Sequence, residues 1–235
     1  MKLRSVALVA GALAMTSWGR DTQQQQLTVL VLNQAGVLEA TLESAAETSR
    51  TIFEKAGIET KWLTCLFTAG KDPCNLAGGI DTPALTIVLN SVPLGKGRQP
   101  DVLGMATLTA PRDRTETTAY IFYDRVEDAA CGTSWAPRSH NLPKAMRRAL
   151  PAVSRLLGNV MAHEAAHLLG LGHSSGGVMS PGLNLEIAAA SSLPFKEREA
   201  RELRDAVAER LAGKTLTAHA WSGAGLEFRQ LAGGH

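Results

Sequence analysis

The sequence predicts an α+β fold: a mixed, mostly parallel, twisted sheet of roughly five strands, with helices packed on it and a last helix near the C-terminus. Three observations lead to this prediction. A strand, a helix and a second strand follow one another near the N-terminus, two strand-like segments joined by a charged turn lie mid-chain, and helical patterns fill the second half. The 235 residues can bury one full core, as a single domain or as a domain divided by a cleft.

The first 19 residues have the pattern of a secretory signal peptide. Lys2 and Arg4 precede an apolar run over residues 6–15, and small residues follow it. The run is too short to cross a bilayer, so we expect no stable membrane span. Cleavage after residue 14 is an alternative to cleavage after residue 19, and an ordinary buried strand or helix is the alternative to a signal peptide. Removal of the signal would give a secreted or periplasmic protein, whereas an intracellular protein would retain residues 1–19.

The charge of the chain indicates no nucleic-acid partner. The chain has 24 basic and 22 acidic residues, and loss of Lys2 and Arg4 with the signal would bring the mature charge close to zero. Nucleic-acid-binding domains are typically basic, so we expect no such binding. The composition leaves the oligomeric state open.

The three cysteines, Cys65, Cys74 and Cys131, lack the close spacing of a zinc cluster. In an exported protein they fit one disulfide and one remaining thiol. We expect the disulfide to join Cys65 to Cys74.

The N-terminal segment predicts a parallel pair of strands. Residues 27–32 are rich in leucine and valine and predict an interior strand. Apolar residues then recur at helical spacing over residues 38–56 and stop at Gly57. Residues 58–63 alternate as a second strand. This unit predicts two parallel strands joined by a right-handed crossover.

The middle of the chain predicts a long loop, a strand and a hairpin. Residues 64–83 have little periodicity and predict a surface loop, and residues 85–89 predict a third strand. Residues 102–110 and 119–123 predict two antiparallel strands joined by the charged turn at residues 111–116. One of these two strands should be the edge of the sheet.

Three carboxylates follow this hairpin, at Asp124, Glu127 and Asp128. They could offer oxygen ligands to Ca²⁺. An acidic strand end is more often only solvated, so calcium stays open.

The last third of the chain predicts helices. Pro143 can start a helix, and Pro151 either kinks it or begins a second helix at its first turn. This helix should run to about residue 169. Residues 195–211 carry apolar side chains at helical spacing with Glu and Arg on the other face, and Gly213 ends the pattern.

Metal-binding side chains gather in the helix that follows Pro151. Positions i and i+4 share one face of a helix, so His163 and His167 can bind one metal ion, and Glu164 borders that face. Catalytic zinc usually takes three protein ligands and keeps one position open. Gly170 can adopt the left-handed conformation that ends a helix, and the returning chain would bring His173 to the ion.

The sequence from His163 to His173 is His-Glu-Ala-Ala-His-Leu-Leu-Gly-Leu-Gly-His, and Met179 follows. It resembles the metzincin metallopeptidases, whose pattern is His-Glu-x-x-His-x-x-Gly-x-x-His plus a later methionine turn. The resemblance implies a zincin fold and one catalytic Zn²⁺ bound by His163, His167 and His173. It also implies that Glu164 acts as the general base and that Met179 forms an apolar floor beneath the imidazoles.

Within the metzincins, the residues around the methionine are most similar to the matrixins. Ser174 follows the third histidine directly, and Met179-Ser180-Pro181 corresponds to the usual Met-Tyr-Pro, with serine in place of tyrosine. The loop between His173 and Met179 is shorter than in typical matrixins. The archaeal-type metzincins carry extra cysteines beyond the third histidine, and this chain has none there.

The resemblance also implies where a substrate would bind. In metzincins the edge strand above the zinc pairs with an extended peptide, which is β-augmentation. An ordinary solvent-facing strand is the alternative explanation of this segment. The residues placed there by the resemblance, together with those of the pocket wall after the methionine, are Gly104, Met105, Ala106, Thr107, Ser180 and Pro181.

These observations predict a zinc-dependent endopeptidase that hydrolyses peptide bonds in an extended protein or peptide substrate. A polar spacer at residues 20–26 would precede a catalytic domain at residues 27–213, with subdomains 27–170 and 171–213, and residues 214–235 would form a tail. The alternative is a catalytically silent, zinc-containing module that binds peptide or surface glycan. The intact Glu164 favours the enzyme, because a purely structural zinc site gains nothing from a base.

Overall fold

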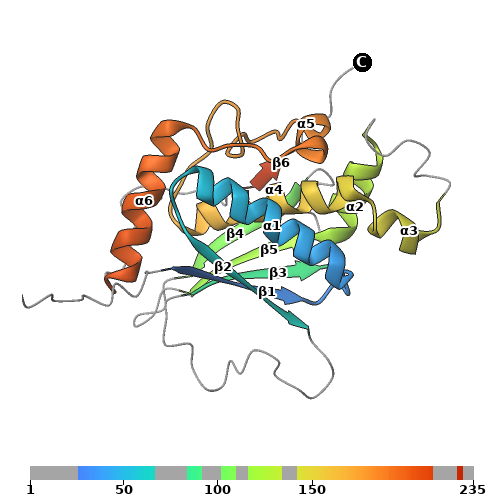
Figure 1. The fold of residues 1–235 in the computed structure, drawn as a ribbon, viewed down its shortest axis with the longest axis horizontal. Coiled ribbons are helices and arrows are strands. Elements are labelled where there is room, and N and C mark those ends of the chain that lie inside the picture. Colours follow the sequence, from blue (N-terminus) through green and yellow to red (C-terminus); the bar gives the residue numbers. More distant parts are fainter. Residues whose placement is uncertain are drawn as a thin grey trace, which may run out of the picture.

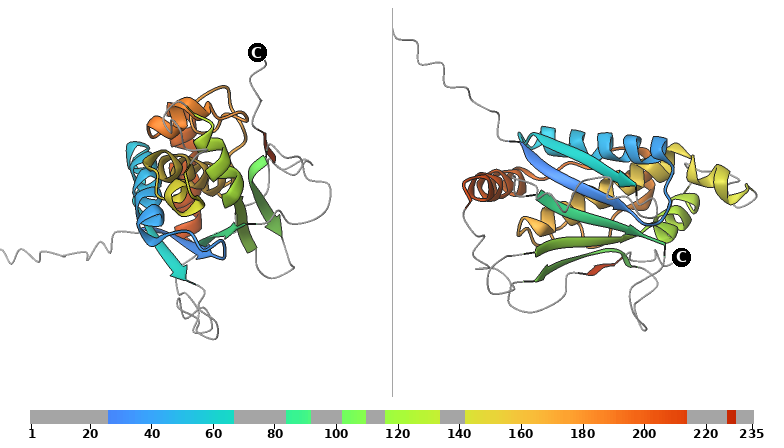
Figure 2. Two further views of the ribbon diagram at one scale, coloured as in Figure 1. Left: turned by 90° about the vertical axis from the view of Figure 1, so that its right-hand side faces the viewer. Right: turned by 90° about the horizontal axis from the view of Figure 1, so that it is seen from below.

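The computed structural model describes residues 26–66, 84–91, 102–109, 116–133, 142–213 and 227–229. These residues form a six-stranded mixed sheet with the long helices packed against one face (Figures 1 and 2). The predicted α+β class is confirmed. The predicted signal peptide, nearly all of the spacer and most of the tail lie outside the described residues.

The sheet has the strand order β2-β1-β3-β5-β4-β6, and its first four strands are parallel. β4 pairs antiparallel with β5 and with β6, so the predicted mostly parallel sheet and the predicted hairpin are both confirmed. The short β6 in the tail was not predicted. The strands are β1 (Leu27–Asn33), β2 (Thr60–Leu66), β3 (Ala84–Asn90), β4 (Val102–Thr109), β5 (Glu116–Phe122) and β6 (Glu227–Arg229).

The predicted strand–helix–strand unit is present, with α1 (Glu39–Lys55) between β1 and β2. The second strand begins two residues later than predicted. The N–H of Ile58 still donates to the carbonyl of Phe53 at 3.0 Å, so residues 56–59 complete the helix end before the strand can start. The strand also extends to residue 66, so the first three residues of the predicted loop belong to the sheet.

The predicted hairpin ends earlier than expected, because a helix starts inside its second strand. α2 (Tyr123–Cys131) begins at Tyr123, which was predicted to be the last strand residue. Glu116, which was predicted in the turn, is the first residue of β5. The acidic residues after the hairpin therefore lie on a helix and not on a strand end.

The helices of the last third are α3 (Lys144–Arg148), α4 (Pro151–Leu168), α5 (Leu185–Ala190) and α6 (Glu197–Leu211). Pro151 is at the first turn of α4, so it begins a separate helix and does not kink a longer one. The short α5 was not predicted; the side chain of Asn184 accepts a hydrogen bond from the N–H of Ile187 at its start.

The core lies between the sheet and the pair α1 and α4, which pack side by side (Figure 1). The sheet contributes Val29, Ile87 and Ile121, and α1 contributes Phe53, all completely buried. α4 is buried along most of its length, which places its histidines inside the molecule.

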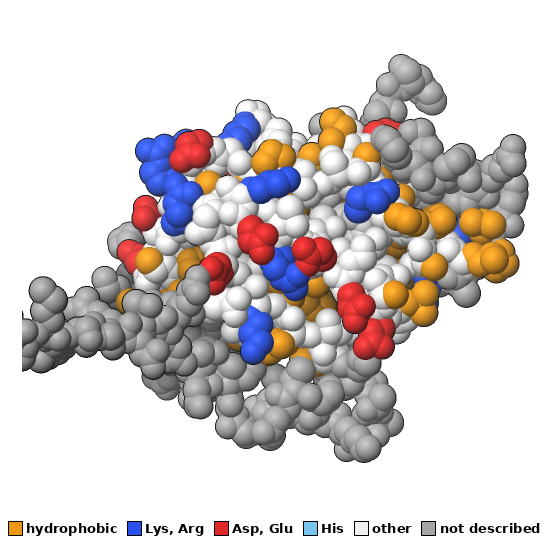
Figure 3. All heavy atoms as spheres, viewed as in Figure 1, with side chains coloured by type: hydrophobic (Ala, Val, Ile, Leu, Met, Phe, Trp, Pro, Cys, Tyr) orange, Lys and Arg blue, Asp and Glu red, His pale blue; other side chains and the backbone are white. Residues whose placement is uncertain are grey.

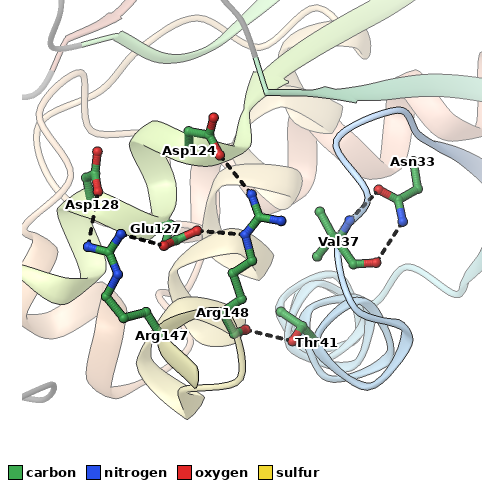
Figure 4. Close-up of polar contacts among 8 residues, drawn as sticks. All are labelled: Asn33, Val37, Thr41, Asp124, Glu127, Asp128, Arg147 and Arg148. Carbon is green, nitrogen blue, oxygen red and sulfur yellow. Dashed lines mark hydrogen bonds and ion pairs between the residues drawn. The ribbon is translucent and has the colours of Figure 1, made fainter. Parts of the chain in front are cut away.

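Paired charges hold α2 against α3. Glu127 of α2 is 1% exposed; its carboxylate lies 3.0 Å from the Nε of Arg148 and 3.2 Å from a guanidinium nitrogen of Arg147. Asp124 also pairs with Arg148, and Asp128 lies 3.7 Å from Arg147 (Figure 4). The three carboxylates for which calcium stayed open therefore face arginines, which compensate their charge, and we propose no calcium site there.

On the face drawn in Figure 3, basic and acidic side chains are interspersed over α1 and α6. Within the described part of the chain, no helix is both long enough and apolar enough to cross a membrane.

Candidate metal and catalytic site

Three imidazoles converge at the C-terminal end of α4. The Nε2 atom of His167 lies 2.9 Å from Nε2 of His163 and 3.2 Å from Nε2 of His173. His163 and His167 are buried, and His173 is partly exposed. The structure thus brings together the three residues that the sequence singled out as metal ligands.

A glycine turn delivers the third imidazole. Gly170 has φ of +93°, in the left-handed region that the sequence predicted for it. The N–H of Leu171 then donates to the carbonyl of Ala166 at 3.1 Å, which is the long bond of a Schellman helix end. The chain therefore reverses directly after α4, and His173 returns to the face that carries His163 and His167.

Two backbone carbonyls fix the orientation of the helical imidazoles. Nδ1 of His163 lies 2.6 Å from the carbonyl oxygen of Val178, and Nδ1 of His167 lies 2.7 Å from that of Leu171. A carbonyl only accepts, so Nδ1 carries the proton and donates in both rings. No residue type in the sequence marks these supporting groups, because they are backbone atoms.

The electrostatics of the cluster favour a cation between the rings. Burial lowers the pKa of His163 well below its usual value, and the pKa of His167 to about 4; burial also lowers the pKa of His173. The imidazoles are therefore neutral near pH 7. With their single protons on Nδ1, the Nε2 atoms of His163 and His167 are two acceptors in contact, an arrangement that a shared cation would relieve.

The donor set fits zinc. Three neutral imidazole nitrogens are a usual ligand set for catalytic zinc, with Zn–N distances of about 2.0–2.1 Å. In tetrahedral geometry such ligands lie roughly 3.3 Å apart, close to the separations of 2.9 and 3.2 Å found here.

Glu164 follows His163 directly on α4 and is a buried carboxylate. Its side chain is completely buried, and neither oxygen has a hydrogen-bond partner among the described residues. Burial raises the pKa of Glu164 well above its usual value. An unpartnered buried carboxylate is costly, which is typical of a functional group and not of a packing residue.

The segment after the third histidine closes back on the site. Met179 is completely buried, and its carbonyl accepts a hydrogen bond from the N–H of Ser174 at 2.9 Å. The hydroxyl of Ser180 donates to the carbonyl of Gly182 at 3.0 Å, and Pro181 is exposed. The roles of Met179 as a floor and of Ser180 and Pro181 as a pocket wall stay predictions.

The four residues predicted to hold a substrate all lie in β4. Gly104 and Ala106 are buried, and Met105 and Thr107 are partly exposed. The edge of β4 away from β5 is not open along its whole length, because β6 pairs with it between Val102 and Met105. Substrate binding by β4 therefore stays a prediction, and part of the edge of β4 that faces away from β5 is paired with β6.

Cys65, in β2, is disulfide-bonded. Cys74, its predicted partner, lies outside the described residues, so the pairing stays a prediction.

Comparisons with known proteins identify no family for this chain. No protein-family model matches it, and no curated protein matches it. Among solved structures, the chain is similar to an archaemetzincin from Methanopyrus kandleri, with 15% sequence identity and a TM-score of 0.48 over 79% of this chain and 98% of that one. At this similarity, the assignment of the site rests on the chain's own residues.

Proposed function

We propose that this protein is a zinc-dependent endopeptidase of the metzincin type. One observation carries the proposal: three imidazole Nε2 atoms converge, and those of His163 and His167 carry no proton. The helix that bears these two rings also bears the buried carboxylate of Glu164, which has no hydrogen-bond partner among the described residues. The His-Glu-x-x-His-x-x-Gly-x-x-His spacing supports the metzincin assignment, and Ser174 and Pro181 support a relation to the matrixins.

His163, His167 and His173 would hold the ion. When bound, zinc supplies a Lewis acid that polarises a carbonyl and lowers the pKa of water to roughly 7. Glu164 would accept the proton of the attacking water and deliver it to the leaving amine. Its burial suits this task, because the raised pKa of the carboxyl allows it both to take up a proton and to release it.

The substrate would be an extended protein or peptide. A peptide can add to β4 through backbone hydrogen bonds, and α4 packs against this strand, so the scissile bond would lie next to the histidines. β6 pairs with the same strand, so a substrate would compete with residues Glu227–Arg229. We further propose that the protein acts outside the cytoplasm, after removal of residues 1–19.

The Glu164→Gln variant tests the proposal. The amide keeps the size of the side chain but cannot take up a proton, so zinc should still bind in a one-to-one ratio while cleavage of a mixed peptide library falls by roughly 10²–10⁴-fold. Metal analysis measures the first quantity, and mass spectrometry of the peptides measures the second. Glu43→Gln, at an exposed position of α1, is the matched control and should cleave like the unaltered protein.

Two outcomes would contradict the proposal. Cleavage that persists in Glu164→Gln or in excess chelator would exclude this chemistry. Zinc retained by the unaltered protein, with no peptide cleaved at all, would favour the zinc-containing binding module instead.

A further inference from the structure

We infer that Gly104 is a positioning residue for Glu164: the missing side chain in β4 leaves the space in which the carboxylate lies. This inference gives Gly104 a role other than contact with the substrate. As a role in catalysis it rests on the proposed function, but the contact itself does not.

The distances leave no room for a side chain at residue 104. A Cβ atom added there would lie 2.4 Å from Oε1 of Glu164, 2.9 Å from its Cδ and 3.0 Å from its Cγ. These are the three nearest atoms, and all belong to Glu164. Even alanine would therefore overlap the carboxylate itself.

The backbone of Gly104 does not otherwise require glycine. Its φ is not in the left-handed region, unlike that of Gly170, and it pairs with Ile121 in the regular β4–β5 ladder. Any residue can adopt this strand conformation. The space taken by Glu164 is thus the physical reason for glycine at this position.

Neither β4 nor α4 can easily move to relieve the overlap. β4 is paired with β5 at Gly104, and the guanidinium of Arg125 donates to the carbonyl of Val102 at 2.7 Å. On α4, the amide of Asn159 donates to the carbonyls of Ala188 and Ser191, each at 2.9 Å. The glutamate side chain has no hydrogen bond in the described residues to hold it, so it is the part that would yield.

A larger residue at 104 would therefore displace the carboxylate while leaving the imidazoles in place. His163 and His167 keep their carbonyl partners at Val178 and Leu171, which lie outside β4. The expected result is a protein that holds zinc but has its base out of position.

A double-mutant cycle on stability tests the contact without any need for activity. The urea midpoint of the full chain is measured in chelator for Gly104→Ala in three backgrounds: Glu164, Glu164→Gln and Glu164→Ala. We expect Gly104→Ala to lower the midpoint clearly with Glu164 and equally with the isosteric glutamine. With alanine at 164 the shift should fall to a third or less, because the shortened side chain leaves room.

Gly132→Ala is the matched control, since it adds the same methyl group at the end of α2, where the nearest atom is 3.4 Å away. Its shift should be the same in all three backgrounds. A Gly104→Ala shift that is also the same in all three would overturn the inference, because the methyl group would then strain something other than Glu164.

Kinetics test the catalytic consequence. Gly104→Ala should lower kcat at least tenfold, with KM within threefold and zinc still bound one-to-one. A rise in KM at unchanged kcat would mean that residue 104 acts on substrate binding and would overturn the positioning role. If the stability coupling is found but the unaltered protein cleaves nothing, the contact stands and the peptidase proposal fails.

Discussion

At the scale of single residues, proton positions prepare this site for a metal. The carbonyls of Val178 and Leu171 keep the protons of His163 and His167 on Nδ1, and burial keeps both rings neutral. The lone pairs of the Nε2 atoms are left to face one another. Such supporting carbonyls orient metal ligands in many metalloproteins, and here they come from the turn after α4 and from the residue before Met179.

Zinc should therefore stabilise the fold through the three imidazoles. At free zinc a hundredfold above its Kd, the free energy of unfolding should rise by about 2.7 kcal/mol, because the ion binds only the folded chain. In His173→Ala this gain should fall by at least half at the same zinc concentration. Urea unfolding with and without zinc measures both.

His219→Ala is the control for this experiment, because residue 219 lies outside the His-Glu-x-x-His-x-x-Gly-x-x-His pattern. Its stabilisation by zinc should equal that of the unaltered protein. Equal stabilisation of the His173→Ala protein would show that the ion binds elsewhere.

At the scale of elements, α4 connects the core to the site. Its N-terminal half packs against α1, where the hydroxyl of Ser49 donates to the carbonyl of Gly158 at 2.8 Å. Its C-terminal half carries His163, Glu164 and His167. The position of the metal ligands therefore depends on how closely the two helices approach one another.

Gly158→Ala tests this close approach. A Cβ at residue 158 would lie 2.5 Å from the carbonyl oxygen of Ala45 and 2.5 Å from Cβ of Thr48, both on α1. Alanine in place of glycine favours a helix by about 1 kcal/mol, but overpacking costs typically about 1–3 kcal/mol. Because the clash includes backbone, we expect a net loss of stability on the order of 1 kcal/mol or more.

Thermal or urea unfolding of Gly158→Ala measures this loss, with Gly132→Ala at the roomier end of α2 as the control. A stabilised Gly158→Ala protein would show that α1 and α4 can separate at little cost. The fixed placement of the histidines by this helix pair would then be wrong.

At the scale of the whole molecule, the sheet edge decides access to the site. β4 separates β5 from β6, and the outermost strand consists of the three C-terminal residues that the structure describes, Glu227–Arg229. Three residues offer few backbone hydrogen bonds, so an extended peptide can compete with them for β4. The tail and a substrate would then exclude one another.

Phe228→Pro tests this competition. Proline fixes φ and removes an N–H, so it disfavours the strand formed by Glu227–Arg229. If the protein is a peptidase, KM for long peptides should fall severalfold while kcat is unchanged. Phe228→Ala, which keeps the N–H, is the control, and an unchanged KM in the proline variant would mean that β6 does not compete with substrate.

Local sequence patterns determined much of this protein. The distribution of apolar residues placed β1, β3, β4 and α1 to within a few residues, and Pro151 and Gly170 marked the ends of α4. Spacing alone put His163 and His167 on one face and predicted the return of His173. These features depend on residues within one or two turns of each other, so the sequence contains all the information they need.

Contacts between segments that are distant in the chain could be determined only from the tertiary structure. The start of α2, the pairing of Glu127 with Arg147 and Arg148, and β6 depend on neighbours far away in the chain. The overlap that any side chain at Gly104 would have with Glu164 is of the same kind, because 60 positions separate a strand residue from a helix residue that meet only in the fold. Residue types and spacing specify which groups are available, but only packing decides which of them come within a few ångströms of one another.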